Sequence, residues 1–355
     1  MHKRLLLSLA LTLLTALLTA CTTSQGASTA SNSQATPTTA MFHEYPLPQP
    51  ASGVMRPAID HEGRLWFGEM GHNALGIFDP HTETFQQLTP PHGASGIMGI
   101  AVAPDDSIWF AEQYANYIGH YIPATHQYHI YPLPTLTLPN TNPAQTIPEA
   151  PNDIALDAQG RVWFTEINAD AIAMLDPRTG AIKHYPISAQ RTIQTYTPYG
   201  ITVDAQGTVW FTTSTRPDLG QLDPHTGKIQ MFALPDRAIT LMEITSDAHG
   251  HIWATAFNAS LVLRFDSTTK TFTSYPASIN ASSGLYGITV TPSGTIWVTL
   301  TPGNAIARLD PTTKRYTSYA IPTENSTPFG LVVDKKGHTV WFTESSGNKI
   351  GELRI

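Results

Sequence analysis

The sequence contains little cysteine, little positive charge and no familiar catalytic motif. Cys21 is the only cysteine in 355 residues, so no disulfide can form within the chain and stability must come from a core. Lys and Arg total 20 against 27 Asp and Glu, without a basic run, which argues against a nucleic-acid partner. G-x-S-x-G, H-E-x-x-H and phosphate-binding loops are also missing, so none of those catalytic classes is indicated.

Long apolar runs are missing as well, apart from one at the N-terminus. Residues 5–18 form an apolar run that follows His2, Lys3 and Arg4, and it is too short to span a bilayer comfortably, which predicts an export signal. The next residues, up to Cys21, resemble the cleavage site of a bacterial lipoprotein, with Cys21 as the lipid acceptor. An ordinary secretion signal with an incidental cysteine is the alternative.

The predicted order is a lipoprotein signal peptide over 1–20, a flexible tether over 21–40 and a folded domain over 41–355. The tether contains almost no residue that could be buried. Loss of Lys3 and Arg4 with the signal would change the net charge from −7 to −9. We therefore expect an exported domain outside the cytoplasm, attached to the bacterial cell membrane only through its lipid.

Seven tryptophans mark seven repeats. Their spacings are 43, 54, 47, 43, 44 and 44 residues, and a period in the low forties indicates a repeat architecture. Each Trp lies in a pattern like that of GITVDAQGTVWFTT (200–213), with alternating apolar residues typical of short strands. We expect each Trp to be a core residue between neighbouring repeats. The seven are Trp66, Trp109, Trp163, Trp210, Trp253, Trp297 and Trp341.

Four short strands per repeat predict an all-β, seven-bladed β-propeller with four-stranded blades. The last repeat ends at Ile355 after its third strand, whereas FHEYPLP (42–48) matches the pattern of a fourth strand, as in HIYPLP (129–134). The N-terminal segment is therefore expected to complete the last blade and to close the ring, which leaves no open sheet edge there.

Alignment of the repeats on Trp identifies a candidate ligand site. The second residue of each first strand is expected to surround the mouth of the central channel, and six of the seven are apolar or aromatic, which suits a partly apolar ligand. The alternative is that these side chains simply plug the channel. We call these residues the central ring: Met55, Met98, Asn152, Tyr199, Met242, Tyr286 and Phe329.

The second strand ends in glutamate in four repeats, on the same face as the central ring because alternate strands run antiparallel. These terminal glutamates, with Asp153 and Glu243 nearby, could coordinate Mg²⁺ or Ca²⁺ or receive a cationic ligand. The alternative is that they end their strands on a solvated rim. A longer connection at 135–149 falls on this face and could form a lid or specificity loop. The terminal glutamates are Glu69, Glu112, Glu166 and Glu344.

The repeated P-[YF]-G-I-T, W-F-T-E, N-x-I-G and Y-P-L-P strings resemble the virginiamycin B lyase (streptogramin lyase) family over roughly residues 42–355. The resemblance implies a seven-bladed propeller and a magnesium-assisted elimination that opens a cyclic depsipeptide. It also implies a histidine base at the position of Phe329 and a substrate-contacting histidine at Tyr286. Two family glutamates correspond to Thr327 and Ser345, and Glu344 is one position away from the second.

Because phenylalanine cannot abstract a proton, the lyase reaction does not follow from the resemblance. His92, in a local P-H-G string, is the candidate for a relocated base. The leading expectation is a monomeric propeller that binds a small molecule, a peptide or an envelope component without the lyase mechanism. The alternatives are a metal-dependent lyase with a rearranged site and a purely structural envelope protein.

Overall fold

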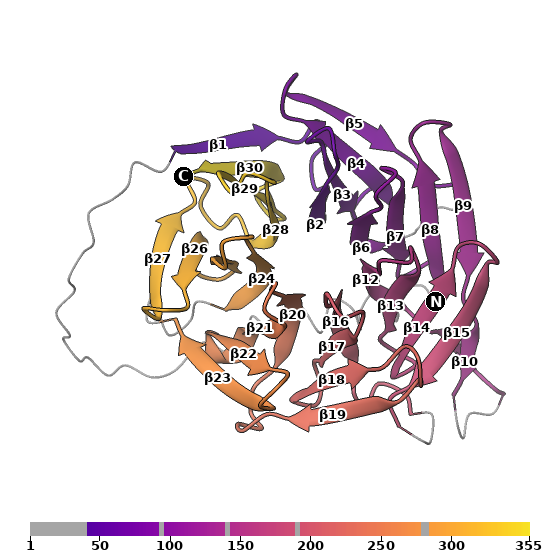
Figure 1. Ribbon diagram of the computed structural model, residues 1–355. Helices are drawn as coiled ribbons and strands as arrows, with labels where there is room; N and C mark the ends of the chain where they lie inside the picture. Colours follow the sequence, from indigo (N-terminus) through magenta and orange to yellow (C-terminus); the bar gives the residue numbers. More distant parts are fainter. Residues whose placement is uncertain (1–40, 92–95, 139–142, 189–191, 278–283) are drawn as a thin grey trace. The chain divides into compact units, whose positions relative to one another are not determined.

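Seven four-stranded antiparallel sheets surround a common axis in the computed structural model (Figure 1). The structure describes residues 41–91, 96–138, 143–188, 192–277 and 284–355. Because the innermost strands of neighbouring sheets lie next to each other around the axis, these sheets are the blades of a seven-bladed β-propeller. The predicted fold class is confirmed.

The blades follow one another along the chain, each numbered from its innermost strand outward. The first four are β2 (Val54–Ile59), β3 (Leu65–Glu69), β4 (Ala74–Asp79) and β5 (Thr84–Leu88); β6 (Ile97–Val102), β7 (Ile108–Glu112), β8 (Tyr117–Ile122) and β9 (Gln127–Pro132); β12 (Pro151–Leu156), β13 (Val162–Glu166), β14 (Ala171–Asp176) and β15 (Ala181–Pro186); β16 (Pro198–Val203), β17 (Val209–Thr213), β18 (Asp218–Leu222) and β19 (Ile229–Ala233).

The last three blades have the same plan, and a short hairpin and one turn of 3₁₀ helix lie outside the blades. The blades are β20 (Leu241–Ser246), β21 (His251–Ala256), β22 (Leu261–Asp266) and β23 (Thr271–Pro276); β24 (Leu285–Val290), β25 (Ile296–Leu300), β26 (Ala305–Asp310) and β27 (Arg315–Ala320); β28 (Pro328–Val333), β29 (Thr339–Glu344), β30 (Lys349–Arg354) and β1 (Met41–Pro46). The hairpin is β10 (Thr135–Thr137) with β11 (Thr146–Pro148), and the helical turn is η1 (Phe257–Ala259).

The first and last strands of the described chain lie side by side and close the ring (Figure 1). β1 pairs antiparallel with β30, from Met41 opposite Arg354 to Pro46 opposite Lys349. The Tyr45 hydroxyl donates to Glu352 at 3.0 Å, and Tyr45 also packs against Trp341 of the same blade. The predicted closure of the last blade by the N-terminal strand is therefore confirmed.

The tryptophans form the core between blades, as predicted. Trp210 of the fourth blade is fully buried and packs against Leu241, Ile244 and Ile252 of the fifth. Its indole N–H donates to Asp204 at 2.7 Å, and the same carboxylate accepts the backbone N–H of Thr208. This bond recurs in three other blades, so the Asp of the D-x-x-G turn joins the turn to the inter-blade core. The other pairs are Trp66 with Asp60, Trp163 with Asp157 and Trp253 with Asp247.

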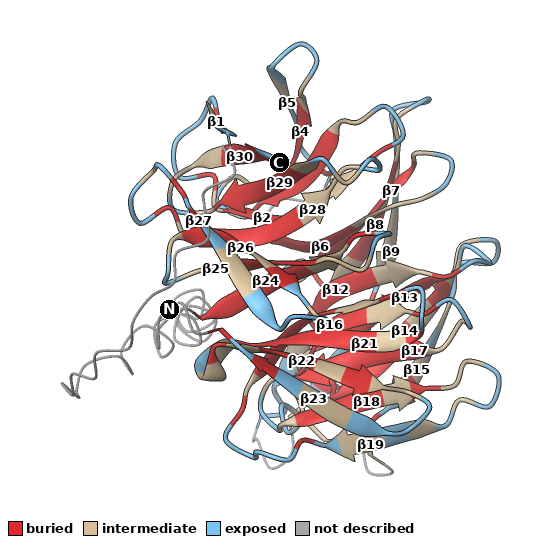
Figure 2. Ribbon diagram, turned by 60° about the vertical axis from the view of Figure 1, so that its left-hand side comes forward, coloured by how far each residue is buried: buried red, intermediate tan, exposed pale blue. Residues whose placement is uncertain are grey.

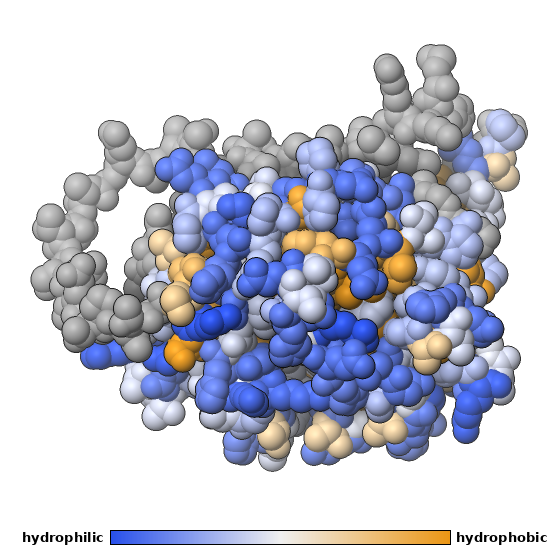
Figure 3. Space-filling view, turned by 90° about the horizontal axis from the view of Figure 1, so that it is seen from above, coloured by the Kyte–Doolittle hydropathy of each residue, from blue (hydrophilic) through white to orange (hydrophobic). Residues whose placement is uncertain are grey.

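Burial decreases from the axis outward. The innermost two strands of each blade are mostly buried, whereas outer strands such as β19 and β23 carry exposed residues (Figure 2). Seen from above, the outer wall is mostly hydrophilic with a few hydrophobic residues near the middle (Figure 3). Among the described residues, the exposed large hydrophobic side chains are Met41, Tyr114 and Ile355. No helix in the described ranges has the length and hydrophobicity needed to cross a membrane.

Candidate functional site

One face of the propeller carries the starts of the innermost strands, the ends of the second strands and the connections between blades. We call it the site face. On this face every innermost strand has a β-bulge: in β12, for example, the register with β13 shifts between Pro151 and Ile154. Two consecutive residues of each innermost strand, here Asn152 and Asp153, therefore lie outside the regular ladder. The central ring occupies the first of these two positions in every blade.

The central ring fills the channel at this level. None of its seven members is more than 8% exposed, and six of them form one cluster. Phe329 and Tyr286 pack with ring centroids 4.0 Å apart, and the Tyr286 hydroxyl is hydrogen-bonded to that of Tyr199. Asn152 joins them by donating to the backbone carbonyl of Tyr199 at 3.0 Å. The channel is thus plugged by the residues that the sequence placed at its mouth.

Partly exposed apolar residues cover this plug. Met70, Ile167 and Phe257 follow directly after second strands, and they pack against the central ring from the site face. Tyr114, from the equivalent connection of the second blade, is exposed and lies over Gly96. The site face therefore has an apolar centre at its surface, although the central ring itself lies beneath it.

A threonine two residues after Trp holds the central ring in place. The Thr255 hydroxyl accepts the Glu243 N–H at 3.1 Å and donates to the Tyr286 carbonyl of the next blade at 2.7 Å. Thr165 and Thr299 make the equivalent bonds, the latter to the Phe329 carbonyl at 2.9 Å. Each threonine thus links the bulge of its own blade to the ring residue of its neighbour, which sequence reasoning did not predict.

A buried ion pair lies beside the central ring. Arg56 donates to both carboxylate oxygens of Glu243, with Nε 3.0 Å from each, and its Nε is 3.7 Å from Asp153. Its guanidinium also lies over the ring of Tyr199, 5.4 Å from the centroid. Burial alone would lower the pKa of Arg56, but Glu243 and Asp153 raise it well above its ordinary value, so Arg56 stays charged.

Asp153 and Glu243 were predicted from the sequence to add negative charge to the site face, whereas Arg56 was not predicted to take part. A signal was present, because the second bulge position is Gly in four blades and charged only in these three. The glycines leave room for neighbouring backbone: a Cβ on Gly99 would lie 2.7 Å from the Asn152 carbonyl oxygen. One Arg, one Asp and one Glu at the same position of three innermost strands indicate an ion pair, because these strands surround one axis.

The terminal glutamates are buried, so the expectation of a solvated rim is wrong. Glu112, Glu166 and Glu344 are 0% exposed and Glu69 is 4% exposed. Their side chains lie on the same side of the second strand as a buried phenylalanine, as with Glu166 and Phe164, and therefore between blades. Desolvation raises the pKa of Glu112 to about 7. Desolvation, with a smaller contribution from Glu44, raises that of Glu344 to about 7.

The four terminal glutamates do not converge on one point. Within the described ranges, Glu166 is the member that lies close to two other donors of metal-ligand type, Glu149 and His184, with ligand atoms within 4.8 Å of one another. Glu69 instead accepts a hydrogen bond from Gln87 at 2.9 Å. A shared Mg²⁺ site built from all four glutamates is therefore not what the geometry offers. Glu149 and His184 were not among the residues selected from the sequence.

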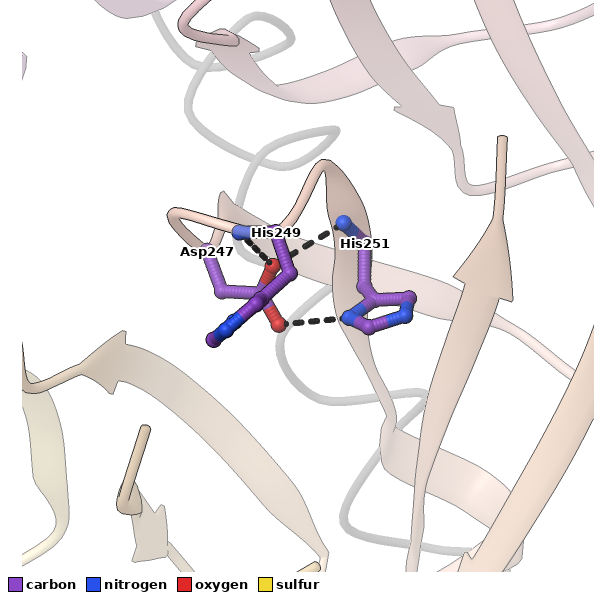
Figure 4. Close-up of side chains that lie close together, drawn as sticks. All are labelled: Asp247, His249 and His251. Carbon is purple, nitrogen blue, oxygen red and sulfur yellow. Dashed lines mark hydrogen bonds and ion pairs between the residues drawn. The ribbon is translucent and has the colours of Figure 1, made fainter. Parts of the chain in front are cut away.

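Asp247, His249 and His251 form a second group of donors (Figure 4). They lie at the turn between β20 and β21, at the opposite end of these strands from the site face. The Asp247 carboxylate is already used by the D-x-x-G turn: one oxygen accepts the backbone N–H groups of His249 and His251, and the other accepts Trp253 and the His251 ring at 2.8 and 2.9 Å. Burial would raise the pKa of Asp247, but these hydrogen bonds lower it. Arg64 and Arg161 take the place of His251 in other blades, so this group is a turn.

Of the remaining sequence predictions, those for His92 and for residues 1–40 are not tested by the structure, whereas the connection at 135–149 is largely described. His92 and the signal peptide and tether at 1–40, with Cys21, lie outside the described residues. The connection at 135–149 contains the β10–β11 hairpin, whose Leu136 packs against Ala169 and Ala171 of the third blade. The backbone N–H of Asn168 donates to the Glu149 carbonyl at 3.1 Å, so the end of this insertion is fixed to the third blade.

The described residues form a seven-bladed propeller whose central ring is apolar and aromatic with one asparagine, and no histidine is among its seven members. Comparison with known proteins identifies the family: the model of the virginiamycin B lyase family matches residues 27–282. The chain therefore belongs to the virginiamycin B lyase family. No curated protein sequence matches it.

Solved structures agree with this assignment. A streptogramin B lyase is 26% identical with a TM-score of 0.78, over 89% of this chain and 97% of the lyase. A catalytically inactive histidine-to-alanine variant of virginiamycin B lyase from Staphylococcus aureus, solved with quinupristin, is 23% identical with a TM-score of 0.78, over 89% and 99%. The extracellular domain of a putative one component system from B. thetaiotaomicron shares the fold at 15% identity and a TM-score of 0.66, over 88% of this chain and 40% of that one.

Proposed function

We propose that this protein is an exported propeller that binds a partly apolar ligand or partner on its site face and does not carry out the elimination of the lyase family. The observation that carries the proposal is the contact between Phe329 and Tyr286, whose ring centroids are 4.0 Å apart. They stand at the two positions where the resemblance implies histidines. Phe329 has no proton-accepting group, and burial raises the pKa of Tyr286 well above its ordinary value, so its hydroxyl stays protonated. Both side chains are buried, with only 6% and 4% of their surface exposed, and their direct contact leaves no space for a substrate between them.

The surface over this contact supports binding. Met70, Ile167 and Phe257 are partly exposed and form an apolar floor, and Tyr114 adds an exposed aromatic ring on the same face. Apolar surface with a few polar groups at its edge is the usual composition of a ligand site. A small molecule, a peptide or an envelope component would each find contacts here. The monomeric state expected from the sequence agrees with the scarcity of exposed large hydrophobic residues in the described ranges.

The alternative is a metal-dependent lyase with a rearranged site. It would need another base and another metal ligand, with His92 and Glu344 as the candidates. Glu344 is fully buried, and Gly347 lies directly against it, since a Cβ there would be 2.9 Å from its Oε2. Access of a cyclic depsipeptide to this carboxylate would require the connection after β29 to move. A structural envelope protein, the third class, would bind no ligand on this face.

One experiment separates these functions. The soluble domain (residues 41–355) is incubated with a type B streptogramin and Mg²⁺, and ring opening is followed by the mass shift of the antibiotic while binding is measured by calorimetry. We expect no turnover. Turnover that is abolished by Glu344→Gln or His92→Ala would establish the lyase and overturn the proposal.

The binding surface is tested with Phe257→Ala and Ile167→Ala. The probe is a peptide or small molecule that binds the unchanged protein in a calorimetric survey of such compounds. These side chains are better probes than Tyr286 and Phe329, because removal of a buried aromatic ring costs about 3–5 kcal/mol of stability and confuses binding with folding. The proposal requires weaker binding with an unchanged thermal midpoint. Undiminished binding by the double variant would place the site elsewhere, and a survey without any binding would favour the structural class.

A further inference from the structure

The interface between the second and third blades contains a group of side chains that neither the ring nor the proposed binding surface uses. Glu149 and Glu166 are 0% exposed, and the His184 side chain is 26% exposed. Nδ1 of His184 lies 3.0 Å from the Glu166 carboxylate and 3.6 Å from Oε2 of Glu149. The three side chains come from the end of the insertion, from β13 and from β15.

The repeats allow a direct comparison with the first blade. Gln87 of the first blade takes the place of His184. Each lies on the fourth strand, opposite the third-strand residue that in turn lies opposite the phenylalanine of the W-F string. Ser52 takes the place of Glu149, three residues before the central ring. In the first blade, Gln87 donates to Glu69 at 2.9 Å, and the neutral Ser52 hydroxyl donates to the Gln49 carbonyl at 3.0 Å.

The third blade thus replaces two neutral donors with a second carboxylate and an imidazole. An ionised Glu149 cannot donate to Glu166, and the repulsion between two buried carboxylates is relieved by a cation. The Glu166 side chain is fully buried, and among the described residues its Oε1 has no hydrogen-bond partner, although it lies 3.0 Å from the His184 ring. One imidazole nitrogen and two carboxylate oxygens, one from each residue, lie within 4.8 Å of one another, and such donors match the ligand sets of divalent transition metals.

We propose that Glu149, Glu166 and His184 bind a divalent transition-metal ion of the Zn²⁺ type. The imidazole favours such an ion over Mg²⁺ and Ca²⁺, which prefer oxygen ligands alone. The site lies between the second and third blades, whereas the metal-linked positions implied by the family resemblance, Thr327 and Ser345, lie in the last. Since Glu149 directly follows β11, the ion would join the inserted hairpin to the third blade.

The test is a calorimetric titration of the purified protein with Zn²⁺, with Glu149→Ser and His184→Gln as variants. Both substitutions introduce the residue that the first blade carries at the same place, so the fold accommodates them. We expect one Zn²⁺ per chain for the unchanged protein, retained in a hundredfold excess of Mg²⁺. Loss of outer-shell partners typically weakens metal binding about 10–100-fold, so removal of either ligand should weaken it by at least about 100-fold.

Matched controls exclude binding at the Asp247 turn. His249→Gln and His251→Arg introduce the residues found at the same turn positions in the third blade, Gln159 and Arg161. This double variant should bind Zn²⁺ as tightly as the unchanged protein. Conversely, Ser52→Glu with Gln87→His should create a second site in the first blade and raise the stoichiometry to two.

Three results would overturn the proposal: no binding to the unchanged protein, equal affinity in the Glu149→Ser, His184→Gln double variant, or loss of binding in the turn variant alone. Thermal unfolding verifies that each variant is folded. If Glu149→Ser unfolds, His184→Gln and anomalous diffraction at the zinc edge decide between this site and the Asp247 turn.

Discussion

At the scale of single residues, Glu112 makes stability depend on pH. Its carboxyl is fully buried, neither oxygen has a hydrogen-bond partner among the described residues, and desolvation raises its pKa to about 7. A raised pKa means that the folded protein holds the proton more tightly than the unfolded chain does. The stabilisation is therefore complete below about pH 4.5 and is lost as the pH rises through 7, by about 3 kcal/mol.

The Glu112→Gln variant should lack this contribution. We expect the free energy of unfolding, measured by denaturant titration, to fall more steeply between pH 4.5 and pH 8 in the unchanged protein than in the variant. Exposed Glu62 serves as the control, since Glu62→Gln should leave the profile unchanged. Parallel profiles for Glu112→Gln and the unchanged protein would show that this carboxyl does not take up a proton in the range.

Arg56 should be needed for stability. Its removal leaves Glu243 and Asp153 buried beside the central ring without their cation, and loss of one partner of a buried pair costs about 3–5 kcal/mol. Arg56→Met is therefore expected to lower the thermal midpoint strongly. A triple variant that adds Asp153→Asn and Glu243→Gln should recover part of the loss. If the triple variant is less stable than Arg56→Met, packing rather than charge determines the effect.

The sequence predicted where the residues of the central ring lie but not what surrounds them. Alignment on Trp placed Tyr286 and Phe329 on one axis, because equivalent positions of a closed repeat must converge there. It could not show that the seven side chains would meet and fill the channel, which depends on their volumes and on the bulge. The bond between Arg56 and Glu243, 187 positions apart, likewise depends on ring closure.

At the scale of elements, β1 should contribute more to stability than the tether does. It supplies the outer strand of the last blade, and its Tyr45 packs against Phe78 with centroids 4.6 Å apart. Deletion of residues 41–48 exposes the edge of β30 and removes partly buried Tyr45 and buried Leu47, so we expect a loss of at least about 3 kcal/mol. Deletion of residues 21–40 should leave the thermal midpoint unchanged. Equal midpoints for the two deletions would contradict the role of β1.

Strand order could be predicted because alternation and turn residues recur seven times. Two features of the elements could not. Glycine at the second bulge position occurs in only four of the seven blades and does not by itself specify a bulge, which takes two adjacent residues out of the regular ladder. The threonine two residues after Trp has the pattern of an ordinary strand residue, yet Thr255 joins the bulge at Glu243 to the Tyr286 carbonyl of the next blade.

At the scale of the whole molecule, the repeats determined the architecture, and the departures from them identify the candidate sites. Arg56 differs from four glycines, Phe329 and Tyr286 differ from the histidines that the resemblance implies, and Glu149 differs from Ser52. The sequence could reveal each departure, but only the closed ring shows which of them lie together. Glu149, Glu166 and His184 meet, whereas the four terminal glutamates do not.

Attachment of the domain to the cell depends on Cys21 if the N-terminal prediction is right. The predicted acyl chains on Cys21 would supply the membrane affinity of this acidic chain. In a bacterial host, Cys21→Ser should move the protein from the membrane fraction to the soluble fraction while residues 41–355 keep their thermal midpoint. Ser24→Ala in the tether is the matched control and should stay with the membrane. A Cys21→Ser protein that remains fully in the membrane fraction would show that a second element holds it there.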